Sequence, residues 1–161
     1  MSSNQSFFSI GALLIFSLIT LRFNTSVLEN SRVEIENKVY LTAFSLADDM
    51  IEEIKQKAFD ASTVDFPTTD PSTLTAPSAL GHADWEFYPN YNDIDDYNNY
   101  SKTVSAPHAE DYNVTCSVFY VDGNNPDQQV YTQTFYKKVN VTVSSPYLNN
   151  SVTLSFIFTL K

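Results

Sequence analysis

The sequence is poor in cysteine and histidine. Cys116 is the single cysteine, which excludes an intramolecular disulfide framework and any zinc site built from several cysteines. The two histidines, His82 and His108, lie far apart in a polar stretch and lack the spacing of metal ligands. Neither they nor Cys116 form a nucleophile–base pair that can be recognised in the sequence. We therefore expect no enzyme, no cofactor and no bound metal.

Positive charge is also scarce. The chain has 9 basic and 19 acidic residues, for a net charge of −10. A nucleic-acid binder needs a basic face to displace counterions from phosphate, so we expect no nucleic-acid contact. Arg22 is the only charged residue among the first 22, so all the acidic residues lie in the rest of the chain.

The N-terminal segment is almost entirely apolar. Residues 7–23 read FFSIGALLIFSLITLRF. A helix of this length spans about 25 Å, which is at the short limit for the bilayer core of roughly 30 Å. Apolar residues on all its faces predict burial in lipid or in protein. A cleavable signal fits poorly, because no basic residues precede the run and no small-residue cleavage site follows it. A membrane anchor and a helix that packs in an assembly both remain open.

An amphipathic segment follows without a glycine or proline before Pro67. Over residues 27–61, apolar side chains recur at spacings of three and four, which predicts a helix with one buried face. The predicted stripe runs through Leu28, Ile35, Val39, Ala43, Leu46, Met50, Ile54 and Ala58. Residues 1–26 and 27–61 then form one long helix. Its weak point is Asn24, Thr25 and Ser26, three poor helix formers in a row, where we expect a kink or unwinding.

In the C-terminal half, the spacing of apolar residues changes from three and four to two. Residues 62–111 are rich in turn-forming residues and predict a loop region, whereas apolar and polar residues alternate in 112–122, 130–144 and 151–160, as in strands. We predict an α+β fold, in which a three- or four-stranded antiparallel sheet over 112–161 packs on the amphipathic helix. Residues 27–161 form this globular domain. Its expected sheet core is Val118, Tyr120, Phe135, Val139, Val141, Leu154, Phe156 and Phe158.

Several polar features of this half have two readings. Asp93, Asp95 and Asp96 could hold Ca²⁺, but they lack the EF-hand spacing, so we favour a solvated connector.

Nine of the ten tyrosines follow residue 87. Their aromatic rings suit either an adhesion face or, as we prefer, the sheet core and packing between subunits. N-glycosylation sequons occur at Asn4, Asn24, Asn99, Asn113, Asn140 and Asn149. The last four are our candidate acceptors.

The layout resembles that of the type IV pilin family, with an apolar half-helix, an amphipathic half-helix, a variable loop and an antiparallel sheet. Three runs carry the resemblance: FFSIGALLIFSLITLRFN, DMIEEIKQKAFD and DIDDYNNYSKTV. Runs like the last two also occur in pilin-like proteins of bacteria. The resemblance covers the whole chain as a layout. It implies a structural subunit of an extracellular, cell-surface filament, with a precursor held in the inner membrane.

The resemblance also implies particular roles and partners. Copies of the chain would form a helical homopolymer, after contact with the inner membrane and the pilus assembly machinery. The filament core would contain Phe7, Phe8, Ile10, Leu13, Leu14, Phe16, Leu18 and Leu21. Gln5 stands at the assembly position where the family usually has glutamate. The family's basic leader is not seen before it, so we expect either that the sequence begins at the mature N-terminus or that export differs in this subset. Arg22 would be a buried charge, with Glu29 of the same or a neighbouring chain as partner. The alternative is a membrane-anchored or minor pilin-like protein that binds a surface ligand.

Overall fold

A computed structural model describes residues 3–106 and 109–160. The chain divides into two compact units, residues 1–38 and 39–161. The helix α1 (Ser3–Ile54) contributes to both units, and the second unit also holds four strands: β1 (Ser101–Ala106), β2 (Ala109–Tyr120), β3 (Tyr136–Ser144) and β4 (Val152–Thr159). Four short 3₁₀ turns, η1 to η4, lie between α1 and β1.

The helix is uninterrupted at Asn24, Thr25 and Ser26, so the unwinding predicted there is wrong. The hydroxyl Oγ1 of Thr25 donates a hydrogen bond to the carbonyl of Leu21 at 3.0 Å, which gives this polar side chain a partner inside the helix. Each poor helix former costs at most about 0.7 kcal/mol relative to alanine. Three of them are not enough to break a helix that continues on both sides.

The helix ends at Ile54 and does not reach residue 61 as predicted. The backbone N–H groups of Gln56 and Lys57 donate to carbonyls three residues earlier, which tightens the last turn. Ala58 then pairs with the connector: its N–H donates to the carbonyl of Asn92, and its carbonyl accepts from the N–H of Ile94. Because the N–H and carbonyl of Ala58 are used in this bridge, they are not available for the hydrogen bonds of a longer helix.

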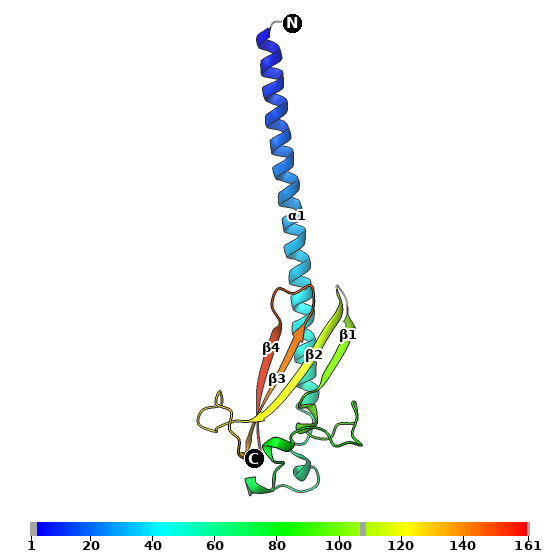
Figure 1. Ribbon diagram of the computed structural model, residues 1–161, viewed down its shortest axis with the longest axis vertical. Coiled ribbons are helices and arrows are strands. Elements are labelled where there is room, and N and C mark those ends of the chain that lie inside the picture. Colours follow the sequence, from blue (N-terminus) through cyan, green and yellow to red (C-terminus); the bar gives the residue numbers. More distant parts are fainter. Residues whose placement is uncertain (1–2, 107–108, 161) are drawn as a thin grey trace. The chain divides into compact units, whose positions relative to one another are not determined.

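The sheet is antiparallel throughout, in the order β1-β2-β3-β4 (Figure 1). The α+β fold is therefore as predicted, with four strands. The boundaries differ, however. Strand β1 lies in a segment that we assigned to a loop, β2 begins at 109 and not 112, and β3 begins at 136 and not 130.

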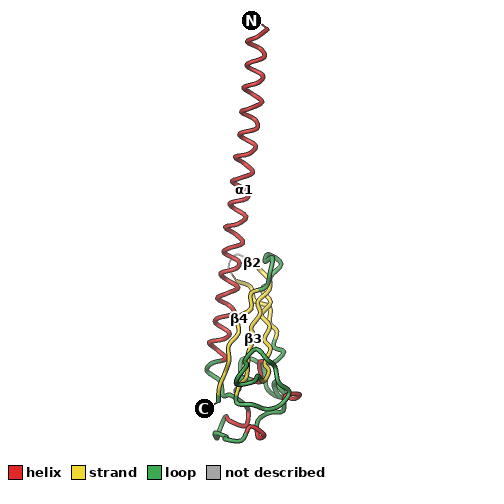
Figure 2. Tube along the Cα trace, turned by 90° about the vertical axis from the view of Figure 1, so that its left-hand side faces the viewer, coloured by secondary structure: helices red, strands yellow, loops and turns green. Residues whose placement is uncertain are grey.

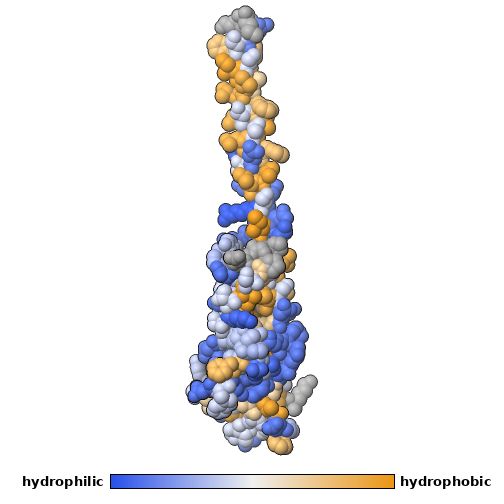
Figure 3. All heavy atoms as spheres, turned by 90° about the vertical axis from the view of Figure 1, so that its right-hand side faces the viewer, coloured by the Kyte–Doolittle hydropathy of each residue, from blue (hydrophilic) through white to orange (hydrophobic). Residues whose placement is uncertain are grey.

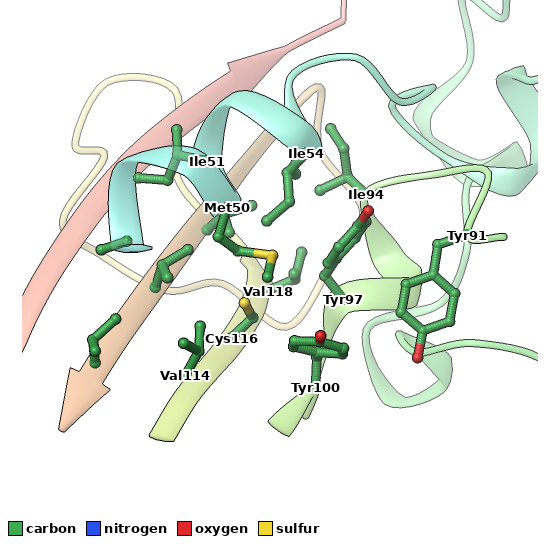
Figure 4. Close-up of a cluster of buried hydrophobic side chains, with 14 of the residues drawn as sticks. Met50, Ile51, Ile54, Tyr91, Ile94, Tyr97, Tyr100, Val114, Cys116 and Val118 are labelled. Carbon is green, nitrogen blue, oxygen red and sulfur yellow. The ribbon is translucent and has the colours of Figure 1, made fainter. Parts of the chain in front are cut away.

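The core of the second unit lies between the sheet and the end of α1 (Figures 2 and 4). The helix buries one face from Val39 onwards, through Val39, Ala43, Ala47, Met50, Ile51 and Ile54. Leu28 and Ile35, which the predicted stripe included, are exposed. The compact unit therefore begins at 39, later than the predicted residue 27.

The predicted strand faces are correct, but burial differs between central and edge strands. Val118, Tyr120, Val139 and Val141 on the central strands are buried, whereas Leu154 and Phe158 on the edge strand β4 are partly buried. Phe135 is also partly buried, but it lies just before β3 and outside the strands. Phe156 pairs with Val139 and so shares its face, yet it remains 37 % exposed. It lies on the edge strand β4, where its ring is covered by the ammonium of Lys55, 4.3 Å from the ring centroid.

Candidate functional site

The first candidate site is the apolar surface of α1. All eight side chains predicted for a filament core are exposed, by 56–80 %; they are Phe7, Phe8, Ile10, Leu13, Leu14, Phe16, Leu18 and Leu21. Apolar side chains are prominent along this part of the helix in Figure 3. By length and composition, the helix could cross a membrane. Such a surface needs cover from lipid or protein.

Two polar residues lie on this surface. Gln5 is in the helix, and its backbone carbonyl accepts a hydrogen bond from Ser9 Oγ at 2.9 Å. Arg22 is exposed, and among the described residues it forms no ion pair, with Glu29 or any other acid. The Arg22–Glu29 pairing is thus not present within the chain. Its formation between neighbouring chains stays a prediction.

The four candidate glycan acceptors differ in their surroundings. Asn99 and Asn149 are exposed and lie outside the strands. Asn113 in β2 and Asn140 in β3 are half-buried, and each accepts a side-chain hydrogen bond from a serine of a neighbouring strand. Asn99 and Asn149 therefore offer the more accessible amides.

The second candidate site is a buried charged cluster that the sequence reasoning missed. The ammonium Nζ of Lys137, on β3, contacts Oδ2 of Asp60 at 2.8 Å and Oδ1 of Asp95 at 2.5 Å. It also donates to the carbonyl of Phe59 at 2.9 Å. Lys137, Asp60 and Asp95 are all at most 2 % exposed. Charges removed from water to this extent require mutual pairing.

The two carboxyl groups of this cluster are in different environments. Asp60 Oδ1 accepts from Ser62 N and Thr75 Oγ1, and Oδ2 accepts from Thr75 N. Burial acts to raise the pKa of Asp60, but Lys137 and these backbone donors outweigh it and hold the pKa well below its usual range. For Asp95, burial prevails over Lys137 and raises the pKa to about 7. Asp60 is thus held as a carboxylate, whereas Asp95 is readily protonated.

The connector around Asp95 is buried, and the solvated connector predicted there is wrong. Asp93, Asp95, Asp96 and Tyr97 are nearly inaccessible. Asp93 Oδ1 accepts from the N–H of Asp95 at 2.6 Å, and Asp96 Oδ2 accepts from the N–H of Asn92 at 2.9 Å. The carboxylates therefore stabilise the turn around η4 (Asp95–Tyr97). Among residues 3–106 and 109–160, no group of histidine, cysteine and acidic residues could hold a metal ion.

Two sequence signals could have found this cluster. Lys137 is in phase with Val139, Val141 and Val143, so strand alternation places it on the buried face. Asp60 and Thr63 form a capping box at the 3₁₀ helix η1 (Ala61–Thr63), and a D-x-x-T pattern can predict such a cap. No local pattern identifies Asp95 as the third member, because it comes from a separate segment.

The tyrosines mainly serve packing. Tyr91, Tyr97, Tyr100, Tyr112 and Tyr120 belong to the buried core, as the preferred interpretation expected for core packing; a role in subunit packing stays a prediction. The hydroxyls of Tyr97 and Tyr88 donate to the carboxylate of Glu53 at 2.7 and 3.1 Å, which fastens the end of α1 to the connector. Tyr131 and Tyr147, in contrast, are largely exposed.

A cavity of about 690 Å³, a size typical of small-molecule pockets, lies beside β2. It is lined by Pro77, Ser78, Leu80, Asn98, Ser117, Val118, Phe119, Tyr120, Gln129, Val130 and Tyr131. This lining includes no carboxylate, imidazole or lysine that could act as an acid or base. Cys116 lies in the core, where burial raises the pKa of its thiol to about 12, so it is a poor nucleophile.

The fold and these sites define an α+β protein with a long apolar N-terminal helix and a four-stranded antiparallel sheet packed against the helix end. Comparison of the chain with protein-family models, curated proteins and solved structures gave no match.

Proposed function

We propose that the chain is the structural subunit of an extracellular type IV pilus-like filament, in which copies of the apolar helix pack against one another. The observation that carries the proposal is the extent of the exposed apolar surface. Within residues 1–38, exposed large apolar side chains begin at Phe7 and, beyond residue 23, recur among polar residues at Val27, Leu28, Val33 and Ile35. At 1.5 Å per residue, Phe7 to Ile35 spans about 42 Å.

A bilayer alone covers too little of this surface. Its hydrocarbon core is about 30 Å thick, so a membrane anchor would leave the end of the surface in water. Copies of the same helix can cover the remainder. Both charge signs occur there, and Glu34 already pairs with Lys38 at 2.7 Å, so ion pairs between neighbouring helices are chemically available. In the second unit, Tyr40, Leu41 and Phe44 are also exposed apolar side chains on α1.

The energetics favour such packing. Burying a dozen large side chains, at about 25 cal/mol per Å², contributes on the order of 20 kcal/mol per subunit. Association costs roughly 4–15 kcal/mol in lost translational and rotational freedom. Packing against neighbouring helices therefore keeps this apolar surface out of water at a net gain, even after this cost. Burial in lipid would supply the same apolar contribution, so it is the length of the surface that favours the polymer over an anchor.

The test is electron microscopy of material sheared from cells that produce the protein, with mass spectrometry of its main band. Filaments made mainly of this chain are expected. We expect Leu28→Asp to abolish filaments while the chain still enters membranes, because Leu28 lies outside the 7–23 segment. Leu14→Asp should also prevent assembly.

Asn30→Asp is the matched control, because it adds the same charge about 200° around the helix from Leu28. It should leave filaments intact. Normal filaments from Leu28→Asp would contradict the proposed packing. Wild-type chain that stays in the membrane fraction, with no filament containing it, would favour the anchored binding protein.

A further inference from the structure

We propose that Lys137 and Asp95 are joined by an intramolecular isopeptide bond, formed by the chain itself with Asp60 as the proton-accepting base. The contacts of three segments carry this inference. Lys137 comes from the start of β3, Asp95 from η4, and Asp60 from the capped turn after α1. All three are buried at one point of the fold, with the ammonium between the two carboxyl groups.

The reacting atoms are close together. Nζ of Lys137 is 2.5 Å from Oδ1 of Asp95. Since a C=O bond measures about 1.23 Å, Nζ lies no more than about 3.7 Å from the carboxyl carbon Cγ. This is near the separation of roughly 3–3.5 Å at which reacting atoms are positioned for attack. The fold thereby holds the amine and the carboxyl group in contact, so that their condensation becomes an intramolecular reaction.

The two acidic residues have distinct roles. Both oxygens of Asp60 accept hydrogen bonds besides its contact with Lys137, so its carboxylate is held ionised against the ammonium. The Lys137 charge that lowers the pKa of Asp60 disappears as the proton is transferred. Oδ2 of Asp95, in contrast, is buried and has no hydrogen-bond partner among the described residues. A carboxyl group with one unpartnered oxygen and a raised pKa is the better acceptor for an amine. Asp95 is therefore the acyl group, and Asp60 the base.

Aromatic rings enclose the site. The Nζ atom lies 4.5 Å from the ring centroid of Phe59 and 5.1 Å from that of Tyr120. The Tyr120 hydroxyl donates to the carbonyl of Thr75 at 2.8 Å, which holds its ring in place. Exclusion of water favours condensation, because water is the product that must leave and the reagent that would reverse the step.

The step balances as a condensation. Asp60 takes one proton from the Lys137 ammonium, and the resulting amine attacks Cγ of the protonated Asp95. The Cγ–N bond forms and one Cγ–O bond breaks, and the departing hydroxyl leaves as water with a proton from the attacking nitrogen. One N–H remains on the amide, and Asp60 retains the proton it accepted. No oxidant, reductant or further reactant is needed.

Intact-mass spectrometry of the full chain tests the proposal. The protein is purified in detergent, kept folded overnight at neutral pH, and then denatured. The expected mass is lower than the sequence mass by one water, and digestion should release one peptide pair joined through Lys137 and Asp95. A full sequence mass would overturn the proposal, as would a water loss located elsewhere, such as an imide at Asp122–Gly123.

The variants separate the roles. Lys137→Arg and Asp60→Asn should both restore the full sequence mass, the second because it keeps an acceptor oxygen but removes the base. Lys138→Arg is the matched control. Lys138 is the next residue and pairs with Asp127 at 2.8 Å, but Asp127 is exposed, so this variant should still lose one water. Loss of water in Lys137→Arg would refute the assignment even if that variant folds poorly.

Discussion

Replacement of Ile54 by alanine tests the packing of α1 on the connector and sheet. Ile54 is fully buried at the end of the helix, and Figure 4 shows it beside Ile94 and Tyr97. Ile54→Ala removes three carbon atoms, which at about 0.8 kcal/mol each corresponds to roughly 2.4 kcal/mol of lost transfer free energy. A cavity term adds to this unless the site collapses.

Collapse at this position is restricted. The carbonyl of Ile54 accepts from the N–H of Lys57, and Ala58 is bridged to Asn92 and Ile94, so neither the helix end nor the connector can move freely into the space. We therefore expect the free energy of unfolding to fall by about 4 kcal/mol, in the upper part of the usual range for such truncations.

Urea unfolding of the full chain in a mild detergent measures this change. Near-ultraviolet circular dichroism follows the buried tyrosines and is insensitive to helix retained in detergent. Leu41→Ala is the control on the same helix, since Leu41 is 62 % exposed, and its effect should stay within about 0.5 kcal/mol. Equal effects of the two variants, or a loss below about 1 kcal/mol for Ile54→Ala, would refute the packing argument.

Three further predictions concern single side chains. Tyr97→Phe removes the hydrogen bond to Glu53 and should lower the free energy of unfolding by about 1.5 kcal/mol; an unchanged urea midpoint would show that this bond is not stabilising. Burial, with the charge of Asp96, raises the pKa of Asp93 to about 6, so the folded chain holds a proton that the unfolded chain releases. Stability should therefore fall by about 1 kcal/mol between roughly pH 5 and pH 7.5 relative to Asp93→Asn, and parallel pH profiles of the two proteins would contradict this. Phe156→Ala should cost only about 2 kcal/mol, less than a full core truncation, because Phe156 is partly exposed; a calorimetric loss as large as that of Ile54→Ala would show it to be a full core residue.

The fold could be predicted wherever the period of a helix or strand decides which side chains lie on its buried face. Alternation in β3 places Val139 and Val141 on the buried face, and spacings of three and four place Val39 and Ala43 on the buried helix face. The same patterns failed at the boundaries. The helix end at Ile54 depends on the bridge from Ala58 to residues 92–94, which local propensity cannot reveal.

The sequence by itself determined the long helix, the alternating strands and the almost entirely apolar segment from Phe7, because period and composition are local properties of the chain. Only the tertiary structure decided which polar residues come together in the core. Lys137, Asp60 and Asp95 lie far apart in the sequence. Alternation can place Lys137 on the buried face and a D-x-x-T pattern can mark Asp60 as a cap, but neither pattern reveals that the three side chains meet. Burial of a charge is favourable only when its partners arrive at the same place, and here that place is formed by the packing of three segments.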